Sequence, residues 1–255
     1  MLTAATYGLI GGAALLLGAF VGLYTNIPQR VVGAIMAFGS GVLISALTFD
    51  LMAKAYESGG FDSTSIGFVV GAVLYVGGDY LIDRFDGHIH KRSHRKKMMA
   101  KAESGKPATP IVSGSAIFLG AMLDGIPESA AIGVGLAAGQ GFGLIMLVAV
   151  FISNLPEGIS GAIGMKQAGK THAYVMGVWS SVVITAGISA VLGYRFLASS
   201  TPDILAAGLA VAAGAILAML ADTMMPEAFE EGGRLIALVT VLGFLLAFVV
   251  SRLAG

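Results

Sequence analysis

Six acidic side chains lie inside long apolar stretches of this sequence, where a charged group is normally excluded. They are Asp50, Asp79, Asp124, Glu128, Glu157 and Asp222. A charge at the centre of a bilayer costs about 2.5 to 3.5 kcal/mol even on lenient insertion scales, so such residues commonly serve a function. Only Lys54, one turn beyond Asp50, is a basic residue placed to pair with any of them. The group must therefore be protonated, hydrated or neutralised by a bound cation.

Two of these stretches carry a Pro-Glu motif with oxygen ligands spaced one helical turn apart. Asp124 and Glu128 are four residues apart in the first, and so are Ser153 and Glu157 in the second. Residues four apart share one face of a helix. Two such faces, with Asn154 beside them, can close around one ion. We therefore predict a metal site formed by Asp124, Glu128, Ser153, Asn154 and Glu157.

Prolines next to these carboxylates predict local disturbance of the helices. Pro127, Pro156 and Pro226 each remove one backbone donor. Irregular backbone at membrane depth occurs where protein or a water-lined cavity surrounds it, and transporters build cation sites from such interrupted helices. The ligands here are all oxygen atoms, which suit Mn(II), Fe(II), Mg(II), Co(II) or Zn(II) with weak discrimination.

The composition is that of an integral membrane protein. Of the 255 residues, 56% are hydrophobic and 12% are charged, with a formal net charge of zero. Soluble domains contain about 25% charged residues. These values exclude a disordered chain, a nucleic-acid binder and a soluble enzyme of ordinary composition. The absence of cysteine excludes disulfides, thiolate metal sites and thiol nucleophiles.

Eight stretches of about 20 mostly apolar residues, the length that a membrane helix needs, follow one another along the chain. The sequence thus predicts an all-α membrane protein with eight transmembrane helices in a single polytopic domain, residues 1–255. With the termini outside, twelve of the 15 Lys and Arg residues fall on the cytoplasmic side, as the positive-inside rule requires. Both termini are therefore expected to be extracytoplasmic. The stretches are residues 4–24, 31–55, 64–83, 111–138, 141–165, 172–197, 203–226 and 233–253.

The loop at about 84–110 is expected to face the cytoplasm, and it contains His88, His90 and His94 within a basic run. A solvated anchor that obeys the positive-inside rule is the favoured interpretation. Weak capture of metal by the imidazoles is the alternative, although the neighbouring cations would oppose a dication.

These residues together resemble the ZIP (Zrt/Irt-like protein) family of divalent metal transporters. The resemblance covers nearly the whole chain, including Ile126-Pro127-Glu128 and Leu155-Pro156-Glu157-Gly158. It implies a binuclear site between helices 4 and 5, reached from outside and emptied into the cytoplasm. Glu128 and Glu157 match the bridging glutamates of the family. The family mostly carries zinc, and some members carry iron, manganese, cobalt or cadmium.

The sequence departs from the family pattern within both motifs. Asp124 stands where the family usually has His, Gly125 where it has Asn, and Ser153 where it often has His. Span 6 also lacks the acid that often completes a second metal site. One well-formed site is therefore expected rather than two, and the zinc preference is less certain than cation transport.

Four further residues are candidates for lining a path to and from the site: Ser45, Asp50, Asp222 and Glu227. Asp50 is equally compatible with a polar contact or a pairing with Lys54. The leading hypothesis is a carrier that imports divalent metal, not an enzyme, with no catalytic cofactor. A proton- or sodium-coupled exporter is the alternative. An intramembrane aspartyl protease is disfavoured because Val76 interrupts its Gly-x-Gly-Asp signature.

The expected partners are divalent metal ions and the lipid bilayer, with no nucleic acid. Small residues four apart on helix faces, such as Gly33 with Ala37, indicate close helix packing and are compatible with a homodimer. A plasma membrane location, as in a bacterial inner membrane, is expected for a multi-pass chain of this size.

Overall fold

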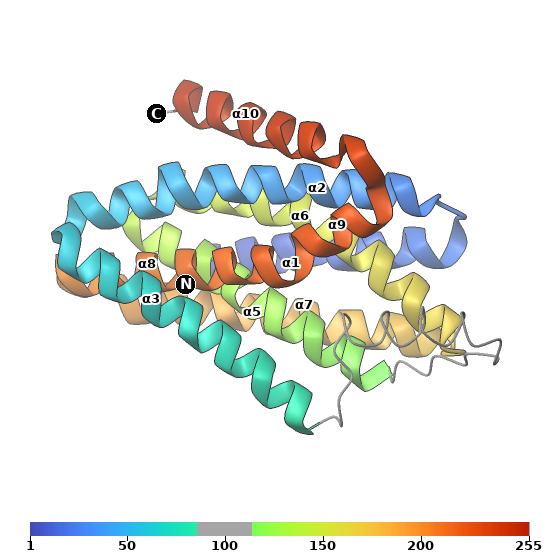
Figure 1. Cartoon of the computed structure of the whole chain (residues 1–255). Helices are drawn as coiled ribbons and strands as arrows, with labels where there is room; N and C mark the ends of the chain where they lie inside the picture. The colour runs from blue at the N-terminus through green and yellow to red at the C-terminus, as the bar shows by residue number, and fades with distance from the viewer. Residues whose placement is uncertain (86–113, 255) are drawn as a thin grey trace.

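The computed structural model describes residues 1–85 and 114–254, and every regular element within these ranges is a helix. This confirms the predicted all-α class. The long helices run side by side as a bundle (Figure 1). They are α1 (Leu2–Tyr24), α2 (Gln29–Ala46), α3 (Ala53–Phe85), α5 (Gly114–Ala138), α6 (Gln140–Gln167), α7 (His172–Leu197), α8 (Pro202–Met219) and α10 (Ile236–Ala254), with the short α9 (Met225–Gly232) and the 3-10 turn η3 (Gly233–Leu235) before α10.

Five helical segments of the described chain are long and apolar enough to cross a membrane. Two of them, Gln29–Leu81 with 53 residues and Pro202–Arg252 with 51, are far longer than the roughly 20 residues that one crossing needs. Each contains a glycine with a left-handed backbone, Gly60 at φ 70° and Gly233 at φ 75°, and the chain reverses direction there (Figure 1). The other three are Leu2–Tyr24, Gly141–Gln167 and His172–Leu197.

The connection expected between spans 31–55 and 64–83 is therefore not an extended loop. The chain is helical on both sides of Gly60, and a single non-helical residue makes the turn. Glycine is suited to this position because a Cβ disfavours a positive φ in other residues.

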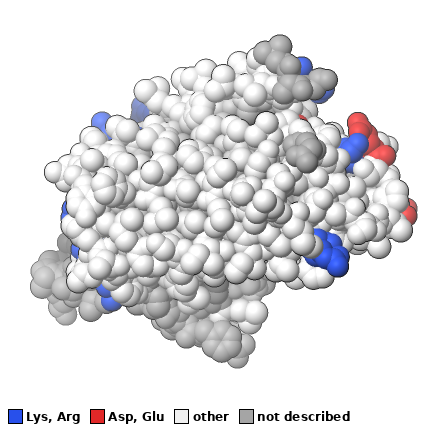
Figure 2. Space-filling model, turned by 180° about the vertical axis from the view of Figure 1, so that it is seen from behind, with Lys and Arg blue, Asp and Glu red and all other residues white. Residues whose placement is uncertain are grey.

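The outer surface of the bundle matches a lipid environment. Large apolar side chains are exposed along α3 and α10, for example Val69, Val73, Leu242 and Leu245. Figure 2 shows that the face seen from behind is mostly uncharged, with Lys, Arg, Asp and Glu near its margins. In water such a surface would be unfavourable, whereas in a bilayer the surrounding hydrocarbon is equally apolar.

The helices pack in three groups. Helices α1, α5, α6 and α7 pack on one another, while α3 packs on α8 and α2 packs on α10. Glycines permit the closest approaches. A Cβ at Gly18 of α1 would collide with the backbone of Leu155, and a Cβ at Gly158 of α6 would collide with that of Leu15. Helix α6 is thus held against α1 by close backbone contact at the level of its Pro-Glu motif.

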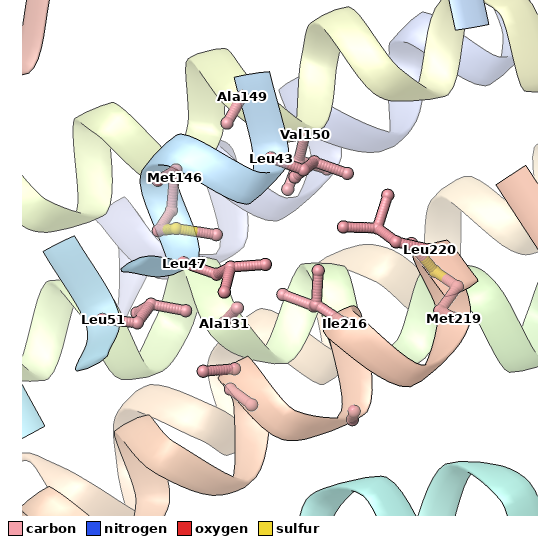
Figure 3. Close-up of a cluster of buried hydrophobic side chains, with 14 of the residues drawn as sticks. Leu43, Leu47, Leu51, Ala131, Met146, Ala149, Val150, Ile216, Met219 and Leu220 are labelled. Carbon is pink, nitrogen blue, oxygen red and sulfur yellow. The ribbon is translucent and has the colours of Figure 1, made fainter. Parts of the chain in front are cut away.

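A cluster of buried apolar side chains lies where these helix groups meet (Figure 3). Ala131 of α5 follows Glu128 by about one turn, and Val150 of α6 precedes Ser153 by about one turn. The cluster therefore lies between the Pro-Glu motifs and the connection of α5 to α6. We call it the apolar plug; its labelled members are Leu43, Leu47, Leu51, Ala131, Met146, Ala149, Val150, Ile216, Met219 and Leu220.

Two helices change to π-helical geometry at an acidic residue. The segment η1 (Leu47–Met52) contains Asp50 and continues α2, and η2 (Leu220–Met224) contains Asp222 and continues α8. Helices α5 and α6, in contrast, continue through Pro127 and Pro156. The expected irregularity is thus confirmed at Asp222, one turn before Pro226, is absent at Pro127 and Pro156, and has an unexpected counterpart at Asp50. Single π-helical turns are frequent at functional sites.

Candidate metal site between helices α5 and α6

Glu128 is at the centre of the candidate site. This residue of α5 is completely buried, with 0% exposure. Oε1 accepts a hydrogen bond from Ser153 Oγ on α6 at 3.2 Å. Oε2 is buried and has no hydrogen-bond partner among the described residues. A buried carboxylate oxygen without a donor is costly unless a proton or a cation occupies it.

Asp124 and Ser153 complete the contact between the two motifs. Asp124, one turn before Glu128, accepts a hydrogen bond at Oδ1 from Tyr75 Oη on α3 at 2.6 Å. Ser153 is also within hydrogen-bonding distance of the Val150 carbonyl, at 3.0 Å. Because a hydroxyl has one proton, Ser153 can donate to Glu128 or to Val150 but not strongly to both.

Asn154 joins the site to α1. Its Nδ2 donates to the carbonyl oxygen of Gly11 at 3.0 Å. This bond orients the amide, and Oδ1 is left buried without a hydrogen-bond partner in the described chain. Ser129, beside Glu128, also has a buried hydroxyl without such a partner. The unpartnered groups at this level are therefore all oxygen atoms, as hard and borderline cations prefer.

Glu157 differs from Glu128 in its surroundings. It is one turn beyond Ser153 on α6 and is only partly buried. Within the described residues, no three His, Asp or Glu side chains gather closely enough to hold a metal ion. The structure thus brings Glu128 and Ser153 into contact, whereas a site of all five residues stays a prediction.

The candidate path residues Asp50 and Ser45 are both buried. Asp50, at 4% exposure, accepts a hydrogen bond at Oδ1 from Ser251 Oγ of α10 at 2.8 Å, and its Oδ2 has no hydrogen-bond partner in the described part. Lys54 pairs with Glu57 at 3.5 Å, and the suggested pairing with Asp50 is not observed. The Ser45 hydroxyl is likewise buried and without a partner in the described residues.

The other two candidate path residues are more open. Asp222 and Glu227 are both partly exposed. Glu227 Oε1 accepts a hydrogen bond from Ser160 Oγ of α6 at 2.9 Å. This bond joins α9 to the part of α6 that follows Glu157. The loop histidines His88, His90 and His94 lie outside the described residues.

Sequence reasoning missed two partners of the acidic groups, Tyr75 and Ser251. Their hydroxyls reach Asp124 and Asp50 from helices distant in the sequence. A hydroxyl in an apolar stretch is the only signal that the sequence offers for such a role, and most of these hydroxyls bond to the backbone of their own helix, as Thr48 does.

The comparisons with known proteins bear on the same features. No protein-family profile matches the chain. Zinc transporter ZupT from Salmonella heidelberg is 28% identical over 229 residues, which cover 87% of this chain and 85% of the relative. ZupT from Salmonella newport and from Salmonella typhimurium are each 27% identical over the same shares. These homologues support membership of the ZIP family.

The similarity to these zinc transporters extends along most of the chain and agrees with a multi-pass membrane protein. It fits the expectation of a transporter rather than an enzyme, because the relatives are named as transporters. The long apolar helices agree with the same conclusion.

Proposed function

We propose that this protein imports divalent metal ions into the cytoplasm through an oxygen-lined site between α5 and α6. The observation that carries the proposal is Glu128, a completely buried carboxylate with one oxygen that lacks a hydrogen-bond partner among the described residues. A dication beside Glu128 would supply the missing interaction and would reduce the cost of the buried charge. Zinc is the expected cargo by homology, since the relatives are named zinc transporters.

The proposed ligands are Asp124, Glu128, Ser153, Asn154 and Glu157. Helices α5 and α6 carry all of them, and the Ser153–Glu128 contact already joins the two motifs. Replacement of the family's motif histidines by Asp124 and Ser153 makes the site entirely oxygen, so Mn(II), Fe(II), Co(II) and Cd(II) are expected to compete with Zn(II).

The proposed membrane arrangement has eight spans with both termini outside. Dividing the two longest helical segments at Gly60 and Gly233, and counting α5, supports this number. Because the chain has no cysteine, single cysteines can test it without interference. We expect an impermeant maleimide applied to intact bacterial cells to label Ser199→Cys but not His172→Cys, and the reverse pattern would contradict the orientation.

Transport itself is tested with the purified protein in liposomes. Uptake of Zn(II), Mn(II), Fe(II), Co(II) and Cd(II) is measured in competition for the natural chain and for Glu128→Ala and Glu157→Ala. Glu57→Ala is the matched control, because this carboxylate is exposed and lies far along the chain from the motifs. We expect uptake to be lost in both site variants and kept in the control.

Failure of the intact, folded protein to take up any dication would overturn the proposal. Efflux of metal that depends on a proton or sodium gradient would instead identify an exporter that uses the same carboxylates.

A further inference from the structure

Tyr75 contacts the proposed site from outside the two motif helices. It lies on α3 with 2% exposure, and its Oη donates to Asp124 Oδ1 at 2.6 Å. This distance is at the short end for hydroxyl donors and is typical of a bond to a carboxylate. Asp124 thus has one oxygen oriented by a residue that no ligand motif contains.

The phenol approaches Asp124 from another helix group. Helix α3 packs mainly on α8, whereas Asp124 belongs to α5, which packs with α1, α6 and α7. The bond therefore joins two helices that belong to different packing groups.

Water is a poor substitute for this phenol. The ring borders a cavity of about 440 Å³ whose lining includes Leu123 and Pro127 of α5 and Ala212 of α8. This lining is apolar and offers a replacement water few hydrogen-bond partners. Loss of the hydroxyl would therefore leave Asp124 Oδ1 without this donor.

We propose that Tyr75 is a positioning residue that sets the orientation of Asp124 toward the transported cation. This inference rests on the proposed function and extends it to a residue outside both motifs. Hydrogen bonds from a second layer of residues orient metal-binding carboxylates, and their loss typically costs 10- to 100-fold in affinity or activity. Tyr75 is expected to act in this way through Asp124 alone.

The same contact is expected to affect the choice of cation. With Oδ1 engaged by the phenol, Asp124 is directed to bind through a single oxygen. Without the hydroxyl, Oδ1 loses this donor and can approach the cation, which favours larger cations that accept more ligands. Tyr75→Phe should therefore raise the uptake of Cd(II) relative to Zn(II).

The test measures equilibrium Zn(II) binding by the purified full chain, in competition with a chromophoric chelator, together with the Cd(II) to Zn(II) uptake ratio in liposomes. The variants are Tyr75→Phe, Asp124→Ala and the double variant. Tyr80→Phe is the matched control, because Tyr80 lies on the same helix with 64% exposure. Phenylalanine keeps the aromatic ring, so the packing of α3 is preserved.

We expect Tyr75→Phe to weaken Zn(II) binding about 10-fold and to raise the Cd(II) to Zn(II) ratio, with Tyr80→Phe unchanged. In the Asp124→Ala background, Tyr75→Phe should have no further effect. An equal loss in both backgrounds, or no effect of Tyr75→Phe or of Asp124→Ala alone, would overturn the inference. If Asp124→Ala abolishes binding, the cation ratio of Tyr75→Phe decides, and an unchanged ratio overturns the inference.

The outcomes separate this inference from the proposed function. If Glu128→Ala and Glu157→Ala lose binding but Tyr75 and Asp124 are not coupled, the proposed metal site is supported and only the role of Tyr75 is overturned. Natural protein that binds no dication would overturn both.

Discussion

The two halves of the proposed path are built differently. At one end, Asp50 is buried, bonded to α10 and flanked along the chain by Leu47 and Leu51 of the apolar plug. At the other end, Glu157, Asp222 and Glu227 are all partly exposed. The difference indicates that carboxylates of one type can serve different steps, because burial by neighbouring helices rather than residue type sets their access to water. The structure is therefore closed at the Asp50 end of the proposed path and more open at the Glu157 end.

Thiol labelling should show the largest contrast between the halves. Leu47→Cys lies in the plug at a position with 4% exposure, while Ser160→Cys lies beside the partly exposed Glu227. We expect the Ser160→Cys variant to react with a water-soluble maleimide about 100-fold faster or more than the Leu47→Cys variant, because the buried position must wait for local opening. The measurement is the labelling rate in detergent-solubilised protein. Equal rates would show that the plug does not exclude water.

Glutamine substitution should separate the two glutamates next. We expect Glu128→Gln to lower the initial rate of Zn(II) uptake about 100-fold and Glu157→Gln about 10-fold, since loss of one charge-assisted interaction is worth roughly 1.5 to 3 kcal/mol and more where burial is complete. Water can partly replace the more open Glu157. A greater loss in Glu157→Gln than in Glu128→Gln would contradict this order.

Two serine hydrogen bonds provide a smaller contrast. Ser251→Ala removes a donor from the buried Asp50, and Ser160→Ala removes one from the partly exposed Glu227. We expect Ser251→Ala to lower the free energy of unfolding by about 1 kcal/mol, and Ser160→Ala by less than about 0.5 kcal/mol, because water can replace the latter donor. Thermal unfolding of both variants under identical detergent conditions checks this, and the opposite order would contradict it.

Lys54→Ala should have the smallest effect. Lys54 pairs with the exposed Glu57 and not with Asp50, and exposed ion pairs contribute about 0 to 1 kcal/mol. We expect uptake and stability close to those of the natural chain. A clear loss of uptake would show that Lys54 acts on Asp50 in another conformation of the protein.

Much of the architecture follows from the sequence because its signals are local. The apolar stretches predict the helices, and Glu128 and Ser153 are identified as candidates by residue type and spacing alone. Their contact across α5 and α6 needed only the assumption that the two motif helices pack together. The helix bounds near residues 56–63 were harder to predict from the sequence. Helix continues up to Gly60, and the backbone conformation of that single residue reverses the chain.

Other features depend on contacts between distant residues. Proline chemistry favours disturbed helices, and π-helical geometry does appear at Asp222, four residues before Pro226, yet α5 and α6 continue through Pro127 and Pro156. The π-helical turn at Asp50 has no proline close after it. A π-helical turn has no simple residue signature. Its position depends on how the whole helix fits against its neighbours.

The sequence by itself determined the membrane class, the apolar helices and the acidic residues that must be neutralised, since each is a property of composition or of spacing along one helix. The tertiary structure decided which carboxylates are buried and which hydroxyls reach them. Tyr75 is separated from Asp124 by 49 residues and Ser251 from Asp50 by 201. Contacts over such separations arise only from the packing of helices, which no local pattern specifies.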